Sequence, residues 1–226
     1  MLTSELLRTL SICSNLKDTE LNLLCEILSK NSYKKILKPK QPLLQIGDET
    51  DMVFILENGL VRTVNYTDTG EEIFFYCFEK GRVINLLNVL SGSINTSQYI
   101  GVKRSELHCI PGENLRQALD EISGFTKQVL IDISNRSLEL IQLMVISRRK
   151  KTRERILSYL CLHYQKTGNQ TYDVPFTIEL LARRLNLTRS ALSKELHVLE
   201  RENLISISKN QIYIKEPEKL ADSLFG

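Results

Sequence analysis

Tryptophan is missing from the 226 residues, histidine occurs only three times, and apolar runs such as Met52–Leu56 are short. A helix that crosses a membrane needs roughly 18 or more consecutive apolar residues, so we expect no membrane span. The first eight residues also lack the basic segment and the apolar stretch of a secretory signal. We therefore expect a cytoplasmic protein that has no membrane partner.

Cysteine and histidine are too scattered to indicate a metal centre. The five cysteines are odd in number and are never spaced as Cys-x-x-Cys, which excludes a zinc motif and a regular disulfide framework. We expect most of them to be small buried residues, with a redox role for one still open. Because His108, His163 and His197 are also far apart, we predict no metal site, no catalytic residues, no cofactor and no enzymatic activity.

The net charge of +3 hides an asymmetry along the chain. Residues 1–146 hold 15 Lys and Arg against 18 Asp and Glu, whereas residues 147–214 hold 13 against 6. A short basic region beside a longer acidic one indicates two domains, of which the second faces a polyanion. Part of the excess lies in Arg148–Arg155, although such a run is more often a solvated helix face than a binding site.

The hydrophobic pattern changes twice along the chain. Leucine and isoleucine at spacings of three and four predict short amphipathic helices in the first thirty residues. From about residue 35 to 110, β-branched and aromatic runs alternate with turn signals such as Asn58-Gly59, which predicts a compact antiparallel sandwich or barrel. The helical period then returns after Pro111-Gly112, so we predict an α+β fold.

One long helix is the simplest prediction for the segment that follows. Its apolar residues have the alternating four-three spacing of a coiled-coil seam. Dimerisation through this seam is favoured over packing on the chain's own sheet, because polar residues such as Asp132 and Glu139 flank it. The predicted domains are residues 1–112, a long dimerisation helix over residues 113–146, and residues 147–226. The predicted seam residues are Leu130, Ile133, Ser137, Leu140 and Met144.

The sharpest local pattern lies in residues 176–214. Thr177 is placed to cap one short helix, and Thr188 is placed to cap a second one about three residues after the first ends. Such a pair is a helix-turn-helix, whose second helix enters the major groove of DNA. Alternation from Ser206 to Ile214, around Lys209-Asn210, predicts a hairpin that makes the motif a winged helix.

The polar residues of this motif are the candidate DNA contacts. Arg189 and Lys194 can donate to the O6 and N7 atoms of guanine, and Ser190 is a short donor or acceptor. Hydroxyl groups can donate to phosphate oxygens, which fixes the register without reading sequence. The residues predicted for that second role are Thr177, Thr188 and Ser193, and capping alone is the alternative for the two threonines. For His197, a solvated surface histidine explains the sequence as well as DNA contact does.

Four segments occur in an order that is more specific than any one of them. They are Gln45–Asp48, Met52–Arg62, Phe78–Ile84 and Leu187–Ile205. With them the chain, from about residue 20 to 214, resembles the cyclic-AMP receptor protein / fumarate-nitrate regulator superfamily of bacterial transcription factors. The resemblance implies an N-terminal β-roll sensor, a dimerisation helix and a C-terminal winged helix that binds a palindromic operator in double-stranded DNA as a homodimer. It also implies RNA polymerase as a partner, and activation more often than repression.

The sensor departs from the members of that family that bind cyclic nucleotides. Where they have a Glu for the ribose and an Arg for the phosphate, this chain has Leu86 and Asn95, and their purine-binding Thr-Ser pair is Leu140-Ile141. Asn95 cannot supply the cation that a buried phosphate requires. We expect no binding of cyclic AMP, and either an unknown, less anionic small-molecule effector or no pocket. The candidate lining is Asn85, Leu86, Asn88, Asn95, Thr96, Leu140 and Ile141, of which the last two have the dimer seam as an alternative.

Two functions from other classes stay open at this point. A cupin-like metal enzyme is one, although the histidines lack the spacing of metal ligands. The other is a basic module that docks an acidic protein without binding DNA. Within the leading hypothesis, Ser190 stands where many family members have a Glu that accepts from cytosine, so the common TGTGA-type half-site is not expected.

Overall fold

The computed structural model describes residues 2–70, 72–174, 177–209 and 211–220. It divides into two compact units, Met1–Arg136 and Ser137–Gly226, which are described separately below. Within these ranges no helix combines the length and the apolarity that a membrane span requires.

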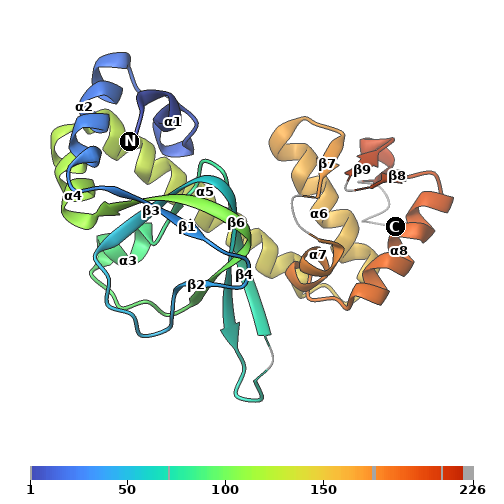
Figure 1. Ribbon diagram of the computed structural model, residues 1–226. Helices are drawn as coiled ribbons and strands as arrows, with labels where there is room; N and C mark the ends of the chain where they lie inside the picture. The colour runs from blue at the N-terminus through green and yellow to red at the C-terminus, as the bar shows by residue number, and fades with distance from the viewer. Residues whose placement is uncertain (1, 71, 175–176, 210, 221–226) are drawn as a thin grey trace. The chain divides into compact units, whose positions relative to one another are not determined.

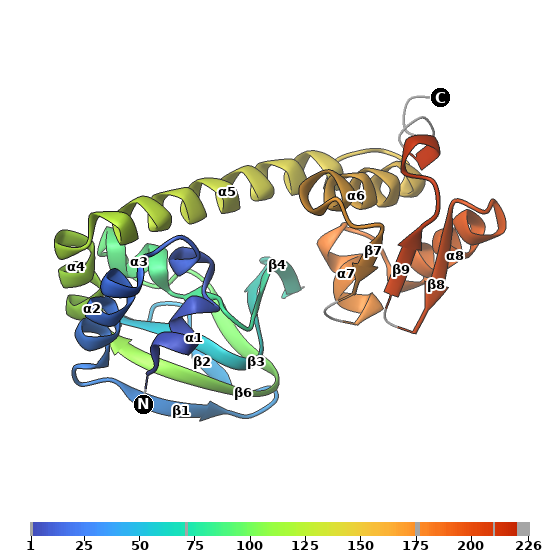
Figure 2. The ribbon, with the colours of Figure 1, turned by 90° about the horizontal axis from the view of Figure 1, so that it is seen from above.

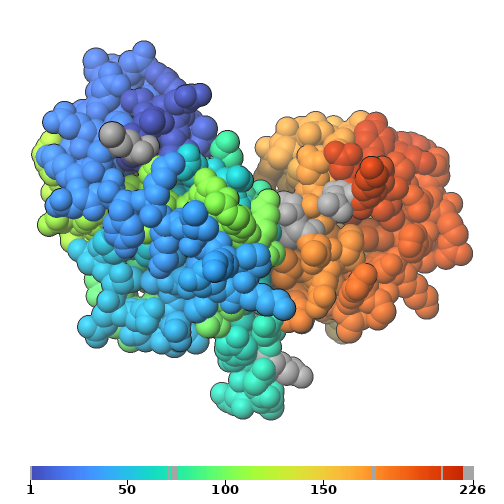
Figure 3. Space-filling model, in the orientation of Figure 1, coloured from blue at the N-terminus to red at the C-terminus, as the bar shows by residue number. Residues whose placement is uncertain are grey.

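The first unit is built around an antiparallel sheet (Figure 1). Four strands follow the order β1-β6-β3-β4, while β2 also pairs with β6 and β5 also pairs with β3. The strands are β1 (Tyr33–Leu37), β2 (Pro42–Leu44), β3 (Met52–Tyr66), β4 (Glu72–Glu79), β5 (Val83–Ile84) and β6 (Gln98–Pro111). The far ends of β3 and β4 form a hairpin that projects from the rest of this unit (Figure 3). The predicted antiparallel β domain is therefore confirmed.

Strand β3 is one long strand where the sequence predicts two short ones. The predicted turn at Asn58-Gly59 lies inside it, and the register against β6 shifts there instead of ending. Gly59 has a φ of 115°, and a Cβ at this position would lie 2.2 Å from the Oγ of Ser105. That hydroxyl accepts a hydrogen bond from the backbone N–H of Leu60 at 3.0 Å. The glycine therefore allows β3 to come close to Ser105 of β6 where the register shifts, and the position acts as a β-bulge.

Helices cover one end of this sheet. The first unit contains α1 (Ser4–Arg8), the 3-10 helix η1 (Ser11–Cys13), α2 (Asp18–Ser29), α3 (Leu86–Ser91), α4 (Gly112–Glu121) and the beginning of α5 (Ser123–Ser147). Figure 2 shows α2 and α4 at the end of this unit where α5 begins. Phe125 and Val129 of α5 are buried there in one apolar cluster with Leu7, Leu24 and Leu115. The N-terminal helices are thus part of the core that holds α5.

The prediction of a single helix over residues 113–146 is wrong in one respect. The chain turns between α4 and α5, so two helices occupy this range. Ile122 has a non-helical backbone, with φ at −120° and ψ at 89°, and its side chain is buried. The Thr126 hydroxyl donates to the carbonyl of Leu119 at 2.5 Å and stabilises the turn. Burial of Ile122 therefore favours a corner over a continuous helix, and the second helix extends across the boundary between the two units.

Cysteine burial agrees with the prediction for most of the five residues. Cys13, Cys77 and Cys109 are buried, and Cys25 and Cys161 are partly buried. Burial raises the pKa of the Cys13 thiol to about 12. Across the described part of the chain, no group of three His, Cys, Asp or Glu is arranged to hold a metal ion.

The second unit is a winged helix preceded by the last turns of α5. Its elements are α6 (Thr152–Thr167), β7 (Thr171–Asp173), α7 (Ile178–Arg184), α8 (Arg189–Arg201), β8 (Ile205–Ser208) and β9 (Gln211–Ile214). Strands β8 and β9 pair as the predicted hairpin, with Lys209 at a φ of 46° in its turn; Asn210 lies outside the described residues. Strand β7, which the sequence pattern does not predict, adds a third strand on the other side of β9.

Candidate nucleic-acid interface

Helices α7 and α8 form the helix-turn-helix at the predicted positions. Thr177 and Thr188 cap them, since their hydroxyls accept hydrogen bonds from the backbone N–H groups of Leu180 and Ala191 at 3.4 and 3.1 Å. The turn between the helices is tight because Asn186 adopts a φ of 53°. Both threonines are exposed, so capping leaves their surfaces open to a partner. The inner side is apolar, with Leu180, Leu181, Leu192, Leu196 and Leu199 buried.

The opposite side of α8 is polar and open to solvent. Arg189, Ser190 and Lys194 are exposed, and Ser193 is half-buried. Among the described residues, neither Arg189 nor Lys194 has an ion-pair partner. The spacing of 190, 194 and 201 places Arg201 on the same face. Arg201 is also exposed, and it was not among the predicted contacts although its spacing could have indicated it.

His197 shares this face but has a partner within the domain. Its Nδ1 lies 3.5 Å from a carboxylate oxygen of Glu200. The other oxygen of Glu200 accepts a hydrogen bond from the backbone N–H of Ile207 at 2.9 Å, which lowers the pKa of Glu200. Glu200 thus ties α8 to strand β8, and His197 lies beside this tie. Its position makes it a weaker candidate for DNA contact than Arg189 or Lys194.

Some residues of the basic run Arg148–Arg155 make contacts within the domain, and others are exposed to solvent. Arg153 donates to both carboxylate oxygens of Glu202, at 3.1 and 2.5 Å, and this contact lowers the pKa of Glu202. Arg155 donates to the backbone carbonyl of Asn186 at 2.6 Å and so supports the turn of the helix-turn-helix. The two arginines therefore hold the domain together. The exposed members of the run are Arg148, Lys150 and Lys151.

The asparagines predicted to line an effector pocket bind one another and the backbone. Asn95 is 2% exposed and donates to the carbonyls of Gln45 and Ser97, both at 2.5 Å. Asn88 donates to the side-chain oxygens of Asn85 at 2.9 Å and Asn95 at 3.3 Å. These amides therefore close the loop around α3, and the amide nitrogens of all three are already bonded.

The other four predicted lining residues have surroundings of other kinds. Leu86 is buried in the apolar cluster of the first unit, and Thr96 is exposed. Leu140 and Ile141 belong to the second unit, with 42% and 57% of their surfaces exposed. Within the first unit, the structure thus brings together three of the seven predicted residues and assigns them a structural role.

One face of α5 carries apolar side chains that no described residue covers. Ile131, Leu138, Ile141 and Val145 are 42–59% exposed and, with Ser134, follow a three-four spacing. The flanking apolar residues Leu130, Leu140 and Met144 are exposed as well. Ile133, predicted in the seam, instead packs against the core of the first unit, whereas the other four predicted seam residues, Leu130, Ser137, Leu140 and Met144, are exposed beside this stripe.

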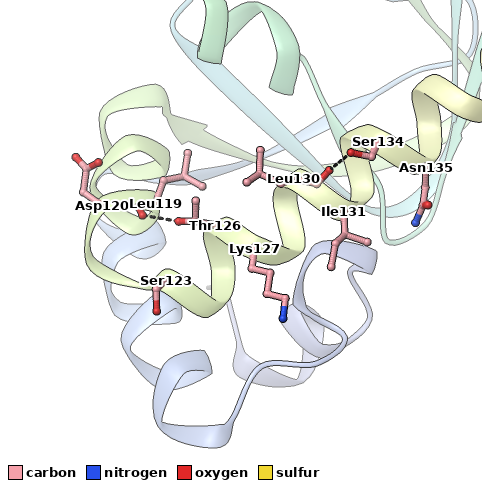
Figure 4. A pocket seen from close by; sticks show the side chains of 9 residues that line it. All are labelled: Leu119, Asp120, Ser123, Thr126, Lys127, Leu130, Ile131, Ser134 and Asn135. Carbon is pink, nitrogen blue, oxygen red and sulfur yellow. Dashed lines mark hydrogen bonds between the residues drawn. The ribbon is translucent and has the colours of Figure 1, made fainter.

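An open groove accompanies this stripe in the first unit. It has a volume of about 640 Å³ and lies along α5 and the end of α4. Figure 4 shows its lining, with the Thr126 hydroxyl bound to Leu119 and the Ser134 hydroxyl bound to Leu130. Because these hydroxyls are already bonded to backbone carbonyls, they add little polarity to the groove, and the surface that it presents is mainly apolar.

An antiparallel sensor-like roll followed by an exposed helix-turn-helix defines a two-domain DNA-binding regulator. A family model described as a cyclic nucleotide-binding domain matches residues 34–121, and a model described as a Crp-like helix-turn-helix domain matches residues 154–223. The chain belongs to the cyclic-AMP receptor protein / fumarate-nitrate regulator superfamily of transcription regulators.

Individual relatives agree with this assignment. A global nitrogen regulator from Nostoc sp. is 25% identical over 182 residues, which cover 77% of this chain and 82% of that protein. Electron transport regulator A from Shewanella oneidensis is 21% identical over 221 residues, which cover 94% of this chain and 85% of that protein. The structure of FixK2 from Bradyrhizobium japonicum, 14% identical, has a TM-score of 0.70 and covers 84% of this chain and 96% of its own. The structural likeness concerns the fold alone.

Proposed function

We propose that the protein binds a palindromic operator as a homodimer and activates transcription through contact with RNA polymerase. The single observation that carries this proposal is that the chain exposes two surfaces suited to partners. One is the polar face of α8, and the other is the apolar stripe of α5. A dimer presents two reading helices related by a two-fold axis, which matches half-sites with centres about one helical turn apart. Dimerisation would also cover the stripe from Ile131 to Val145.

Direct reading of bases is assigned to Arg189, Lys194 and Ser190, and phosphate contact to Thr177, Thr188 and Ser193. The exposed arginine and lysine are the side chains that can donate to guanine in the major groove. We keep His197 as a candidate contact of lower rank because Glu200 lies beside it. The protein is expected in the cytoplasm, where its DNA partner would be found.

The first test is DNA binding as a function of salt. Genomic fragments retained by the protein are sequenced, and the affinity for one of them is measured by fluorescence anisotropy between 50 and 200 mM salt. If 6–10 phosphates are contacted, the affinity should fall roughly 10³- to 10⁵-fold over this range. A flat salt response, or retention of an acidic protein in place of DNA, would favour the interaction-module alternative.

Cyclic AMP is not expected to bind the sensor. Asn95 is committed to two backbone carbonyls, and an uncompensated phosphate charge in a buried site is strongly unfavourable. A saturating concentration of cyclic AMP should therefore leave the unfolding temperature unchanged in a thermal-shift assay. Stabilisation equivalent to about 2.7 kcal/mol, the effect of a ligand at 100 times its Kd, would contradict this prediction. The relatives' names refer to nitrogen in one case and electron transport in another, so they do not select an effector.

Enzymatic activity is not part of the proposal. The curated relatives named above are regulators, and the described histidines and cysteines do not form a metal-binding group. A cupin-like reaction would require such a group.

A further inference from the structure

Arg184, the last residue of α7, is bound to the helix that precedes the DNA-binding domain. Its guanidinium donates to a carboxylate oxygen of Glu139 on α5 at 2.6 Å. The side chain of Arg184 is 11% exposed and that of Glu139 is 26% exposed. Among the described residues, most ion pairs involve at least one well-exposed partner, and exposed pairs contribute little because water screens them. The Arg184–Glu139 pair is shielded on both sides, so it constrains the geometry more strongly.

A second contact fixes the direction of the Arg184 side chain. The guanidinium carbon lies 5.6 Å from the centre of the Tyr159 ring on α6, within the range of a cation–π interaction. Tyr159 in turn packs edge-on against Tyr172 of β7, with the two hydroxyl oxygens 2.9 Å apart. Arg184 therefore joins three elements, α5, α6 and α7, and its partners are themselves held by packing.

The surroundings of Glu139 on α5 support the same role. Leu143 and Ile146 follow it at spacings of four and three residues, which places them on one helix face, and both are buried. That face is opposite to the exposed apolar stripe. The last turns of α5 therefore present a carboxylate and two apolar side chains inward and the proposed dimer surface outward.

Arg184 also stands immediately before the turn of the helix-turn-helix. Leu185 is buried behind it, and the turn is supported from α6 by Arg155, which donates to the carbonyl of Asn186 at 2.6 Å. A shift of Arg184 would move the end of α7 and, through a connection of four residues, the start of α8 where Arg189 lies. The contact is thus located where a small displacement changes the aim of the reading residues.

We propose that Arg184 is a positioning residue for DNA recognition, which acts through Glu139 to hold the reading motif at a defined angle to α5. The proposal rests on DNA binding by this domain. Arg184 does not touch the DNA in this role. It sets the spacing and orientation of the two reading helices in a dimer, so its removal should affect a palindromic operator more than random DNA.

The test compares four variants with the full-length wild type on an operator fragment that the wild type selects and on random DNA of equal length. Glu139→Gln and Arg184→Gln remove the charge pair, and the exchange Glu139→Arg with Arg184→Glu restores it in the opposite sense. The matched control is Glu216→Gln, which removes a carboxylate paired with Lys219 at 2.6 Å elsewhere in the same unit. Thermal unfolding of each variant separates a local effect from loss of the fold.

Each single pair variant is expected to bind the operator roughly tenfold more weakly, within the 5- to 150-fold range typical of coupled sites, with less than a twofold change on random DNA. The exchange variant should recover most of that loss, and the control should match the wild type. Unchanged operator affinity in both single variants would overturn the proposal, as would equal losses on both DNAs without recovery in the exchange variant. If the wild type selects no DNA, the proposed function fails first, which is a separate outcome.

Discussion

Leu138→Glu combined with Ile141→Glu should convert the protein to a monomer and weaken operator binding roughly 100-fold or more. Both residues lie on the apolar stripe of α5, and they are 58% and 57% exposed in the single chain. In a two-fold symmetric dimer each substitution occurs twice, so four carboxylates would meet in one seam. Burying unpaired charges costs far more than the roughly 1.5–3 kcal/mol gained from burying each original side chain.

The oligomeric state is measured by light scattering after size exclusion, and operator affinity by fluorescence anisotropy. The matched control is Leu87→Glu, because Leu87 is 59% exposed but belongs to a different helix, α3. The control should remain dimeric with wild-type affinity. A double variant that stays dimeric would show that another surface forms the dimer, and a wild type that is monomeric at the concentrations of DNA binding would remove the basis of the palindromic model.

Arg189→Ala should weaken binding to the cognate operator by roughly 1–3 kcal/mol and relax the preference at one base position. Arg189 is exposed, lies in the first turn of α8 and has no ion-pair partner among the described residues, so its donors are available to a base. An arginine that binds guanine O6 and N7 contributes to one position only. The loss of affinity should therefore depend on the DNA sequence. The salt dependence of binding to random DNA should remain almost unchanged.

The measurement is selection from a randomised operator library by the wild type and the variant, followed by affinities for single-position mutants. Arg201→Ala serves as the comparison, since Arg201 is at the other end of the same helix, about 18 Å away along its axis. We expect that variant to show at most a uniform change on all DNAs. If Arg189→Ala instead weakens cognate and random DNA equally, Arg189 binds phosphate and sequence is read elsewhere.

Local signals in the sequence predict most of the DNA-binding domain. Thr177 and Thr188 cap their helices as predicted, because a cap depends on residues within three positions of one another. The exposed polar face of α8 also follows from helical spacing alone. The third strand, β7, was missed because it has three residues and pairs only with β9, some forty residues later.

The sensor shows where local signals mislead. Asn58-Gly59 has the sequence of a turn, but Ser105 on another strand makes the position a bulge. Asn95 is a candidate lining residue through the family resemblance, and no local pattern predicts that its amide donates to the carbonyl of Gln45, fifty residues earlier. In both cases the outcome depends on a strand or loop that is distant in the sequence.

Helix α5 shows what the apolar period of the sequence predicts and what only burial in the fold decides. Its apolar period predicts an amphipathic helix with a seam, but periodicity does not say which apolar residues the chain's own core takes. The core of the first unit takes Ile133, while the other four predicted seam residues stay exposed, so only the fold shows which members of the pattern remain at the surface.

Capping and periodicity, which act over a few residues, together with the charge asymmetry predict the order of the domains and the reading helix, and the resemblance of four segments indicates the family. Contacts between distant segments assign the remaining roles, because burial and the choice of partner depend on which side chains meet in space. Arg155 and Arg184 illustrate this difference. Both add to the positive charge that indicates a polyanion, yet the folded domain uses the first to support its turn and the second to bind Glu139.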